Sequence, residues 1–337
     1  HISRARAMAP ALEKLGIEVD FLFSGRQPDQ YFDMAPFGDF SLRTGLTFVT
    51  EEGKIRPLKT VLRSAPLQFL RDIHQLELDN YDLVLTDFEP ITAWAAKLRN
   101  KPVLGLGHQY AFNFPVPQHH GNLHQRLIMK YFAPAKRALG FHWYHFDMPI
   151  LPPIAPVERN NAAIDPELIV VYLPFEAPAK IEQFLQPFKH HHFAVYHPDA
   201  PASKSKKVVM KARFHNDLSR CNGVVCNAGF ELSSEVLQLG CKLLVRPVQG
   251  QSEQLSNVLA LQRIGLGYTM NTLDQAAFSK WLETGRGVSV RYPDVAGAVT
   301  QWLTQGDYSQ QSIEALALQL WRRSRFPQQP LFAATAT

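Results

Sequence analysis

The strand–turn–helix pattern of residues 223–257 constrains the fold of this chain more than any other feature. The apolar run 223–225 predicts a buried strand, Gly229 predicts a tight turn, and the residues that follow predict a helix. A second strand is predicted at 243–245, and a polar loop after it opens another helix. Strands that alternate with helices in this way indicate βαβ units and a mainly parallel sheet.

The glycine turn also predicts a binding site. It places the backbone N–H groups of Gly229, Phe230 and Glu231 at a helix start, where unpaired donors and the helix dipole favour an anion such as diphosphate. Glu235 lies six residues after the glycine, about one and a half helical turns along. Its carboxylate can accept two hydrogen bonds from vicinal hydroxyls, such as those of a ribose.

The loop after the second strand completes the expected ligand. Glu253 and Gln254 offer acceptors and a donor that suit the hydroxyls of a sugar. Diphosphate, ribose and sugar together make a nucleotide sugar, so the sequence predicts a nucleotide-sugar donor as ligand.

These residues resemble the donor-binding signature of GT-B glycosyltransferases, in particular the bacterial peptidoglycan N-acetylglucosaminyltransferase and the wider UDP-glycosyltransferase group. The match consists of Gly229 with glutamate six residues later, a glycine turn at 240–242, and Pro247 ahead of the acidic/Gln pair, which is followed by Asn257. Asn227 departs from the pattern, because relatives often carry His or Arg there near the phosphates. This departure argues against a side-chain cation near the phosphates. It does not affect the backbone N–H groups that are expected to bind the diphosphate.

The resemblance implies the fold and the reaction. The fold is α/β GT-B, with two Rossmann-like, doubly wound parallel-sheet domains that face each other across a cleft. The reaction is the transfer of a hexosyl or N-acetylhexosaminyl group, with inversion, from a UDP-linked donor to an acceptor hydroxyl, in the synthesis of cell-envelope polysaccharide. Two alternatives remain open: a nucleotide-sugar 2-epimerase or hydrolase of the same fold, and a non-catalytic donor-binding subunit.

The resemblance to a two-domain fold also implies how the chain divides into domains. We expect an N-terminal, acceptor-side domain at 1–150, a proline-rich linker at 151–167 and a nucleotide-sugar-binding domain at 168–309. A helix at 310–325 is expected to cross back to the first domain, with a tail at 326–337.

The chain opens with a helix that begins at His1. In the resembling family a strand and a Gly-x-Gly-His turn come before such a helix. That first strand is central in a doubly wound sheet, so a domain without it would expose an apolar seam. We therefore expect the first strand to belong to a longer natural chain.

Three residues are candidates for the acceptor side. His1 matches the catalytic-side His of the family, as general base or as a group that orients the acceptor hydroxyl, whereas an exposed terminal His is the alternative. Asp87 ends a predicted strand and can pair with that His, or cap the helix that follows. Glu89 is a competing base.

Two further pairs are candidates for ligand contacts. His108 and Gln109 end the strand 103–107 on the same sheet edge and are placed to touch the acceptor or the donor sugar. The glycines before them are equally explained by tight backbone packing. Phe214 and His215 stand where the resembling family holds the nucleotide base, although a core Phe is the alternative.

No metal ion or cofactor is expected. The chain contains no Asp-x-Asp pair to bridge a metal ion and a diphosphate, so backbone donors are expected to neutralise the leaving group. Its three cysteines lack the spacing of metal ligands and indicate reduced thiols in the cytoplasm.

The composition narrows the partners. Apolar residues make up 46% and charged residues 19%, as in globular proteins, and the net charge of +5 is too mild to indicate nucleic acid. Segments 58–71 and 126–143 combine bulky apolar groups with Lys and Arg. They are interpreted either as helices that rest peripherally on anionic lipid or as ordinary amphipathic core helices.

Overall fold

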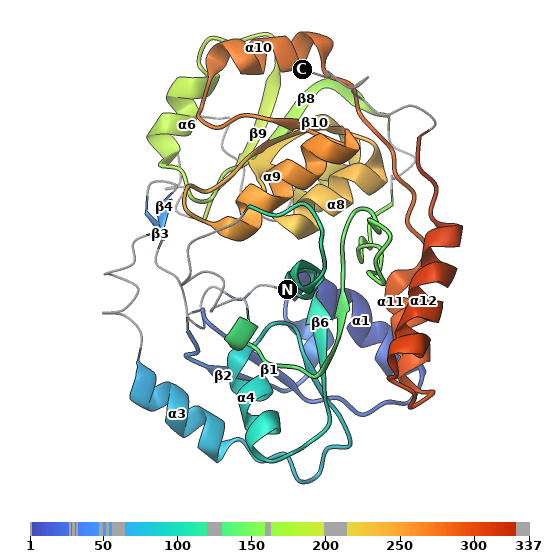
Figure 1. Cartoon of the computed structure of the whole chain (residues 1–337). Helices are drawn as coiled ribbons and strands as arrows, with labels where there is room; N and C mark the ends of the chain where they lie inside the picture. The colour runs from blue at the N-terminus through green and yellow to red at the C-terminus, as the bar shows by residue number, and fades with distance from the viewer. Residues whose placement is uncertain are drawn as a thin grey trace.

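The computed structural model describes residues 2–26, 28, 31, 33–46, 50–51, 54–55, 65–119, 130–158, 163–198 and 214–327. Figure 1 shows the elements in two α/β groups, one above the other in this view, with α11 and α12 along one side. His1 lies outside the described residues.

The C-terminal group is built on a five-stranded sheet in the order β12-β11-β10-β8-β9, in which all neighbours are parallel. Its strands are β8 (Asp165–Tyr172), β9 (His192–Tyr196), β10 (Cys221–Asn227), β11 (Lys242–Arg246) and β12 (Tyr268–Thr269). The order places β10 between β11 and β8, so the segment that follows β10 leaves from the centre of the carboxyl edge.

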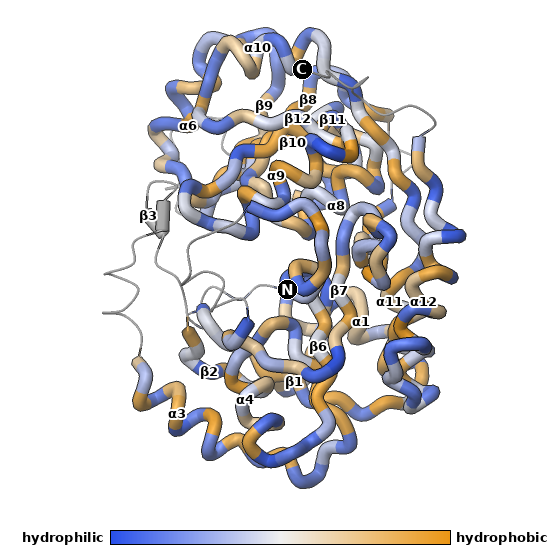
Figure 2. Tube along the Cα trace, in the orientation of Figure 1, coloured by the Kyte–Doolittle hydropathy of each residue, from blue (hydrophilic) through white to orange (hydrophobic). Residues whose placement is uncertain are grey.

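Helices cover both faces of this sheet. Alternate residues of a strand point to opposite faces, and Val224 joins one buried cluster while Val225 joins the other. The second cluster lies under α6 and α10, whereas the first lies under α8 and α9 and continues into the N-terminal group. The helices are α6 (Pro178–Leu185), α7 (Phe214–Arg220), α8 (Phe230–Leu239), α9 (Ser252–Ile264) and α10 (Gln275–Thr284). Figure 2 shows hydrophobic and hydrophilic residues alternating along these helices, as such covering requires.

The N-terminal group holds two parallel sheets, β1-β2 and β5-β6-β7. The strands are β1 (Phe21–Ser24), β2 (Phe40–Arg43), β5 (Val84–Thr86), β6 (Val103–Gly107) and β7 (Arg137–Gly140), and β3 (Thr50–Glu51) pairs antiparallel with β4 (Lys54–Ile55). The helices are α1 (Ile2–Lys14), α3 (Pro66–Gln75) and α4 (Pro90–Leu98), with 3₁₀ turns η2 (Ala35–Phe37) and η3 (His108–Asn113). The sequence predicts tight packing at the glycines of β6. At Gly105 the packing is tight, because an added Cβ would lie 2.5 Å from the Tyr110 ring.

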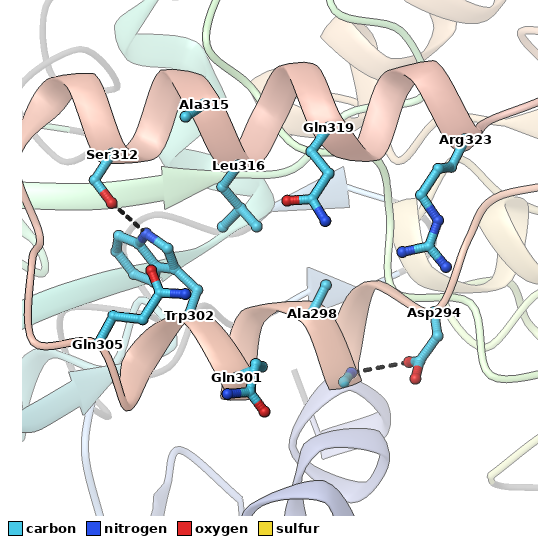
Figure 3. Close-up of a pocket in the computed structure, with 11 residues that line it drawn as sticks. Asp294, Ala298, Gln301, Trp302, Gln305, Ser312, Ala315, Leu316, Gln319 and Arg323 are labelled. Carbon is cyan, nitrogen blue, oxygen red and sulfur yellow. Dashed lines mark hydrogen bonds between the residues drawn. The ribbon is translucent and has the colours of Figure 1, made fainter.

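The last two helices, α11 (Val295–Leu303) and α12 (Gln310–Arg323), return to the N-terminal group. Figure 1 shows α11 beside α1 and α12 beside α11. Figure 3 shows them facing each other across a pocket, where Trp302 Nε1 donates to Ser312 Oγ at 2.7 Å. The indole of Trp321 donates to the carbonyl of Ile150, which ties α12 to the segment that precedes β8.

A cavity of about 1070 Å³ extends from the N-terminal sheets to the C-terminal group. Leu22, Leu83 and Leu85 line its apolar part, between β1 and β5. Its polar part is lined by Asp87 and by Glu253, which belong to the two different groups. This part is the cleft between them.

One secondary-structure expectation is wrong. Segment 126–143 was interpreted as an amphipathic helix, but Arg137–Gly140 forms strand β7, paired in parallel with β6. Leu139, Phe141 and Trp143 are fully buried there, so burial in a sheet overrides the local pattern. Residues 126–129 of this segment, and residues 58–64 of the segment 58–71, lie outside the described part of the chain.

Candidate functional site

The centre of the site is the turn from β10 into α8. Gly229 is the N-cap residue of α8, and no described side chain caps that helix. Of the three N–H groups that the sequence assigned to an anion, that of Gly229 is already used, because it donates to the carbonyl of Asn227 at 2.7 Å. The expected anion site is therefore confined to the first turn of α8, at Phe230 and Glu231.

Glu235 lies in the second turn of α8 and is only 7% exposed. Its carboxylate has no hydrogen-bond partner in the described part of the chain. Burial, and then the neighbouring charge of Glu231, raises its pKa to about 7. A buried carboxylate without a partner costs stability. Such a group is typical of a ligand site from which the ligand's own donors are absent.

Arg4 joins the two groups and was not singled out from the sequence. Its guanidinium donates from Nε and Nη2 to the two carboxylate oxygens of Asp87, each at 2.9 Å, and Nη2 lies 3.0 Å from Glu231 Oε1. The side chain is buried, and the two carboxylates raise the pKa of its guanidinium. Its position three residues after His1, about one helical turn, was the available signal.

Glu89 caps α4. Its carboxylate accepts hydrogen bonds from the N–H groups of Ile91 and Thr92, and from the hydroxyls of Ser24 and Thr92, at 2.7–3.0 Å. The capping role that the sequence offered to Asp87 thus belongs to Glu89.

His108 lies in the contact between the groups. It is completely buried, and its ring stacks on Phe230 with centroids 3.9 Å apart. Its Nδ1 lies 2.8 Å from the carbonyl oxygen of Phe141, and its Nε2 lies 2.7 Å from Asn257 Oδ1. Burial lowers the pKa of this imidazole. The structure therefore places His108 behind the cleft wall, where it joins β6 to α8 and α9.

Glu253 and Gln254 differ although they are neighbours at the start of α9. Glu253 lines the cleft and accepts a hydrogen bond from Gln109 Nε2 at 3.1 Å. Gln254 is buried, and its Oε1 accepts from the N–H of Val248 at 2.9 Å. Of the two, Glu253 faces the cleft and Gln254 shapes the loop.

Phe214 and His215 open α7, and the preceding residues 199–213 lie outside the described chain. Phe214 is half-buried and packs edge-on against Tyr172 and Tyr196, whereas His215 is exposed. Neither residue lines the cleft cavity.

Within the described residues, no group of three or more His, Cys, Asp or Glu side chains is placed to hold a metal ion. None of the helices described is long and apolar enough to cross a membrane.

The structure thus has two α/β groups, and a helix start and a buried carboxylate lie at the carboxyl edge of a parallel sheet. This arrangement agrees with the protein family that the sequence matches. The family model described as glycosyl transferase family 1 matches residues 1–284. The chain belongs to this family. It is a glycosyltransferase. No match was found among proteins of curated function.

Solved structures confirm the GT-B fold of this glycosyltransferase. The spinosyn rhamnosyltransferase SpnG is 15% identical with a TM-score of 0.54, covering 95% of this chain and 92% of its own. SsfS6 of Streptomyces sp. SF2575, complexed with thymidine diphosphate, is 14% identical with a TM-score of 0.53, covering 90% and 95%. The calicheamicin glycosyltransferase CalG4 is 12% identical with a TM-score of 0.52, covering 96% and 90%.

Proposed function

We propose that this glycosyltransferase transfers a sugar from a UDP-linked donor to an acceptor hydroxyl, with inversion and without a metal ion. The observation that carries the proposal is Glu235. It is a buried carboxylate without a described partner, one and a half turns behind the uncapped start of α8. Two ribose hydroxyls would supply the missing donors while the diphosphate occupies the helix start.

The acceptor side rests on Asp87. Each of its oxygens accepts a hydrogen bond from Arg4, which fixes the orientation of the carboxylate at the cleft. We propose His1 as the general base that pairs with it. Glu89 is the weaker candidate, because hydrogen bonds from the start of α4 and from Ser24 occupy both of its oxygens.

The domain division stays part of the proposal, with the acceptor domain at 1–150, the linker at 151–167 and the donor domain at 168–309. Since α11 packs with α1 in the N-terminal group, we extend the returning segment to include α11 as well as the helix at 310–325.

A cytoplasmic, membrane-peripheral location is proposed on two observations. The sulfur atoms of Cys221 and Cys241 lie 3.8 Å apart, which is a hydrogen-bond distance and not that of a disulfide, as in a reducing compartment. Leu67 and Leu70 are exposed on α3 beside Arg71. Sedimentation with anionic phospholipid vesicles should recover the protein, and the Leu67→Asp, Leu70→Asp variant should stay in the supernatant. Equal recovery of both would exclude α3 as the contact.

The donor proposal is tested by calorimetry with UDP, dTDP and GDP. UDP should bind most tightly, and Glu235→Ala should weaken it by about 1.5–3 kcal/mol, the range for hydrogen bonds to a charged group. Glu182→Ala, which removes an exposed carboxylate from α6, is the matched control. Unchanged UDP affinity in Glu235→Ala would exclude the ribose assignment. Turnover should persist in excess EDTA, and loss of turnover with rescue by Mn²⁺ would exclude metal independence.

A further inference from the structure

An ion pair lies behind the cleft wall of the C-terminal group. Arg246 is the last residue of β11, and Glu176 lies in the loop between β8 and α6. Nη1 of Arg246 donates to Oε1 of Glu176, and the two residues are 6% and 5% exposed. Since β10 lies between β11 and β8, the pair spans the carboxyl end of β10, where the chain turns into α8. Phe175 and Gly250, close to the pair in sequence, line the cavity.

The guanidinium of this pair is incompletely satisfied. Of its five N–H donors, the one on Nε is buried and has no hydrogen-bond partner. The loop with Glu176 is held in place, because its carbonyl oxygen lies 2.8 Å from Nε2 of His197 and its N–H donates to Leu173. Small shifts of this loop therefore do not offer the missing acceptor. A buried donor without an acceptor costs stability, and groups of this kind call for an explanation by a ligand or an ion.

A second unsatisfied atom lies at the same edge. Asn227 is in register with Arg246 on the neighbouring strand, and its Nδ2 donates to the carbonyl of Arg246 at 3.0 Å. This bond fixes the orientation of the amide and leaves Oδ1 buried without a partner. One orphan donor and one orphan acceptor match a ligand that carries both anionic oxygens and hydroxyl groups.

The charge around the start of α8 points to the same ligand. The other buried cation there, Arg4, is already shared by the carboxylates of Asp87 and Glu231. The charge of Arg4 is therefore already neutralised by two carboxylates. Arg246 has one carboxylate partner and retains a donor, so it is the cation better placed to accept a further anion.

We propose that Arg246 binds the diphosphate of the donor from beneath the β10–α8 turn, while Asn227 Oδ1 accepts a hydroxyl of the same ligand. This inference rests on the proposed function and deepens it. A planar guanidinium can bind two phosphate oxygens at once, which a lysine cannot do. Glu176 holds the guanidinium in place.

The test measures the affinities of inorganic pyrophosphate, UDP and uridine by calorimetry. Arg246→Met should lower the affinity for pyrophosphate and UDP by about 10- to 100-fold and leave uridine unchanged. Arg246→Lys should fall between the wild type and Arg246→Met. Arg263→Met, which removes an exposed cation from α9, is the control and should change none of the three. An equal loss for uridine and UDP would show a structural role and overturn the proposal, as would a wild-type protein that does not bind pyrophosphate.

Glu176→Gln provides a second variant in case Arg246→Met does not fold. It keeps the guanidinium and removes the competing anion, so pyrophosphate affinity should rise, whereas a fall would overturn the proposal. The outcomes also separate the two proposals. Suppose that Arg246→Met weakens the binding of pyrophosphate, but the wild type binds UDP no more tightly than pyrophosphate. That result would support the role of Arg246 in binding phosphate and would exclude a UDP-linked donor.

Discussion

The starts of α4 and α8 lie at the carboxyl edges of two parallel sheets, one in each group, yet they differ in how their polar groups are satisfied. At α4, Glu89 caps the helix through its side chain, and the nearby Asp87 is bound by Arg4. At α8, no described side chain caps the helix, and Glu235, Asn227 Oδ1 and Arg246 Nε lack partners.

This difference separates two uses of the same geometry. A helix start that serves the fold is satisfied by its own chain, because unpaired donors weaken the helix. A helix start that serves a ligand leaves its donors available, and the protein loses stability until the ligand arrives. This difference supports the proposal that α8 binds the donor, whereas the start of α4 supports Asp87.

The largest effect is expected at Asp87. Asp87→Ala should lower turnover by about 10²–10⁴-fold, the range for loss of general-base catalysis, while UDP affinity stays nearly unchanged, because the proposed nucleotide site lies in the C-terminal group. Kinetics and calorimetry on the same samples measure both. In combination with His1→Ala the losses should be strongly non-additive, because two groups that act as a unit fail together. Fully multiplicative losses would assign the two residues separate roles.

The next effect concerns Glu235 and pH. Its folded pKa of about 7 lies above the ordinary value of 4.5, so the stability linked to this group is fully present below pH 4.5 and is lost as the pH rises through about 7. At pH 8, Glu235→Gln should therefore raise the free energy of unfolding by about 3 kcal/mol, measured by denaturant titration.

Glu235→Gln should also weaken UDP binding at pH 8, because an ionised carboxylate is a stronger hydrogen-bond acceptor than an amide. Wild-type affinity for UDP should fall as the pH drops from 8 to 6, and that of Glu235→Gln should vary less. A variant that is no more stable than the wild type at pH 8 would contradict the buried, unpartnered carboxylate.

A smaller effect should follow from giving α8 the cap that it lacks. Gly229 has φ −74° and ψ 147°, and nothing lies within 4 Å of a Cβ added there, so a side chain fits. Gly229→Asp should raise stability by about a few tenths of a kcal/mol and lower UDP affinity about tenfold or more, because its carboxylate competes with the diphosphate. Gly229→Ala is the control. Equal UDP affinities of the two variants would place the diphosphate elsewhere.

The reverse change at α4 should affect only the fold. Glu89→Ala removes the cap and should lower stability by about 0.5–2 kcal/mol, measured by thermal and denaturant unfolding, with UDP affinity unchanged. If Glu89→Ala abolishes turnover in folded protein, Glu89 is the base, and not His1 paired with Asp87.

Local structure could be predicted from the sequence, whereas contacts between residues far apart in the chain could not. The strands and helices around Gly229 were predictable, because apolar periodicity and a glycine turn act over a few residues. Segment 137–140 was taken as helix, since only its pairing with β6 makes it a strand. The contact of Arg4 with Asp87 joins positions 83 residues apart, so no local pattern contains it.

The sequence by itself determined the α/β class, the turn at Gly229, the helix with Glu235 and the membership in a glycosyltransferase family. The tertiary structure decided which polar groups are occupied. It assigned the cap of α4 to Glu89, buried His108 against Phe230, and placed Arg246 across the end of β10. The physical reason is that backbone propensities and periodicity are local, whereas hydrogen-bond satisfaction and desolvation depend on which distant residues the fold brings together.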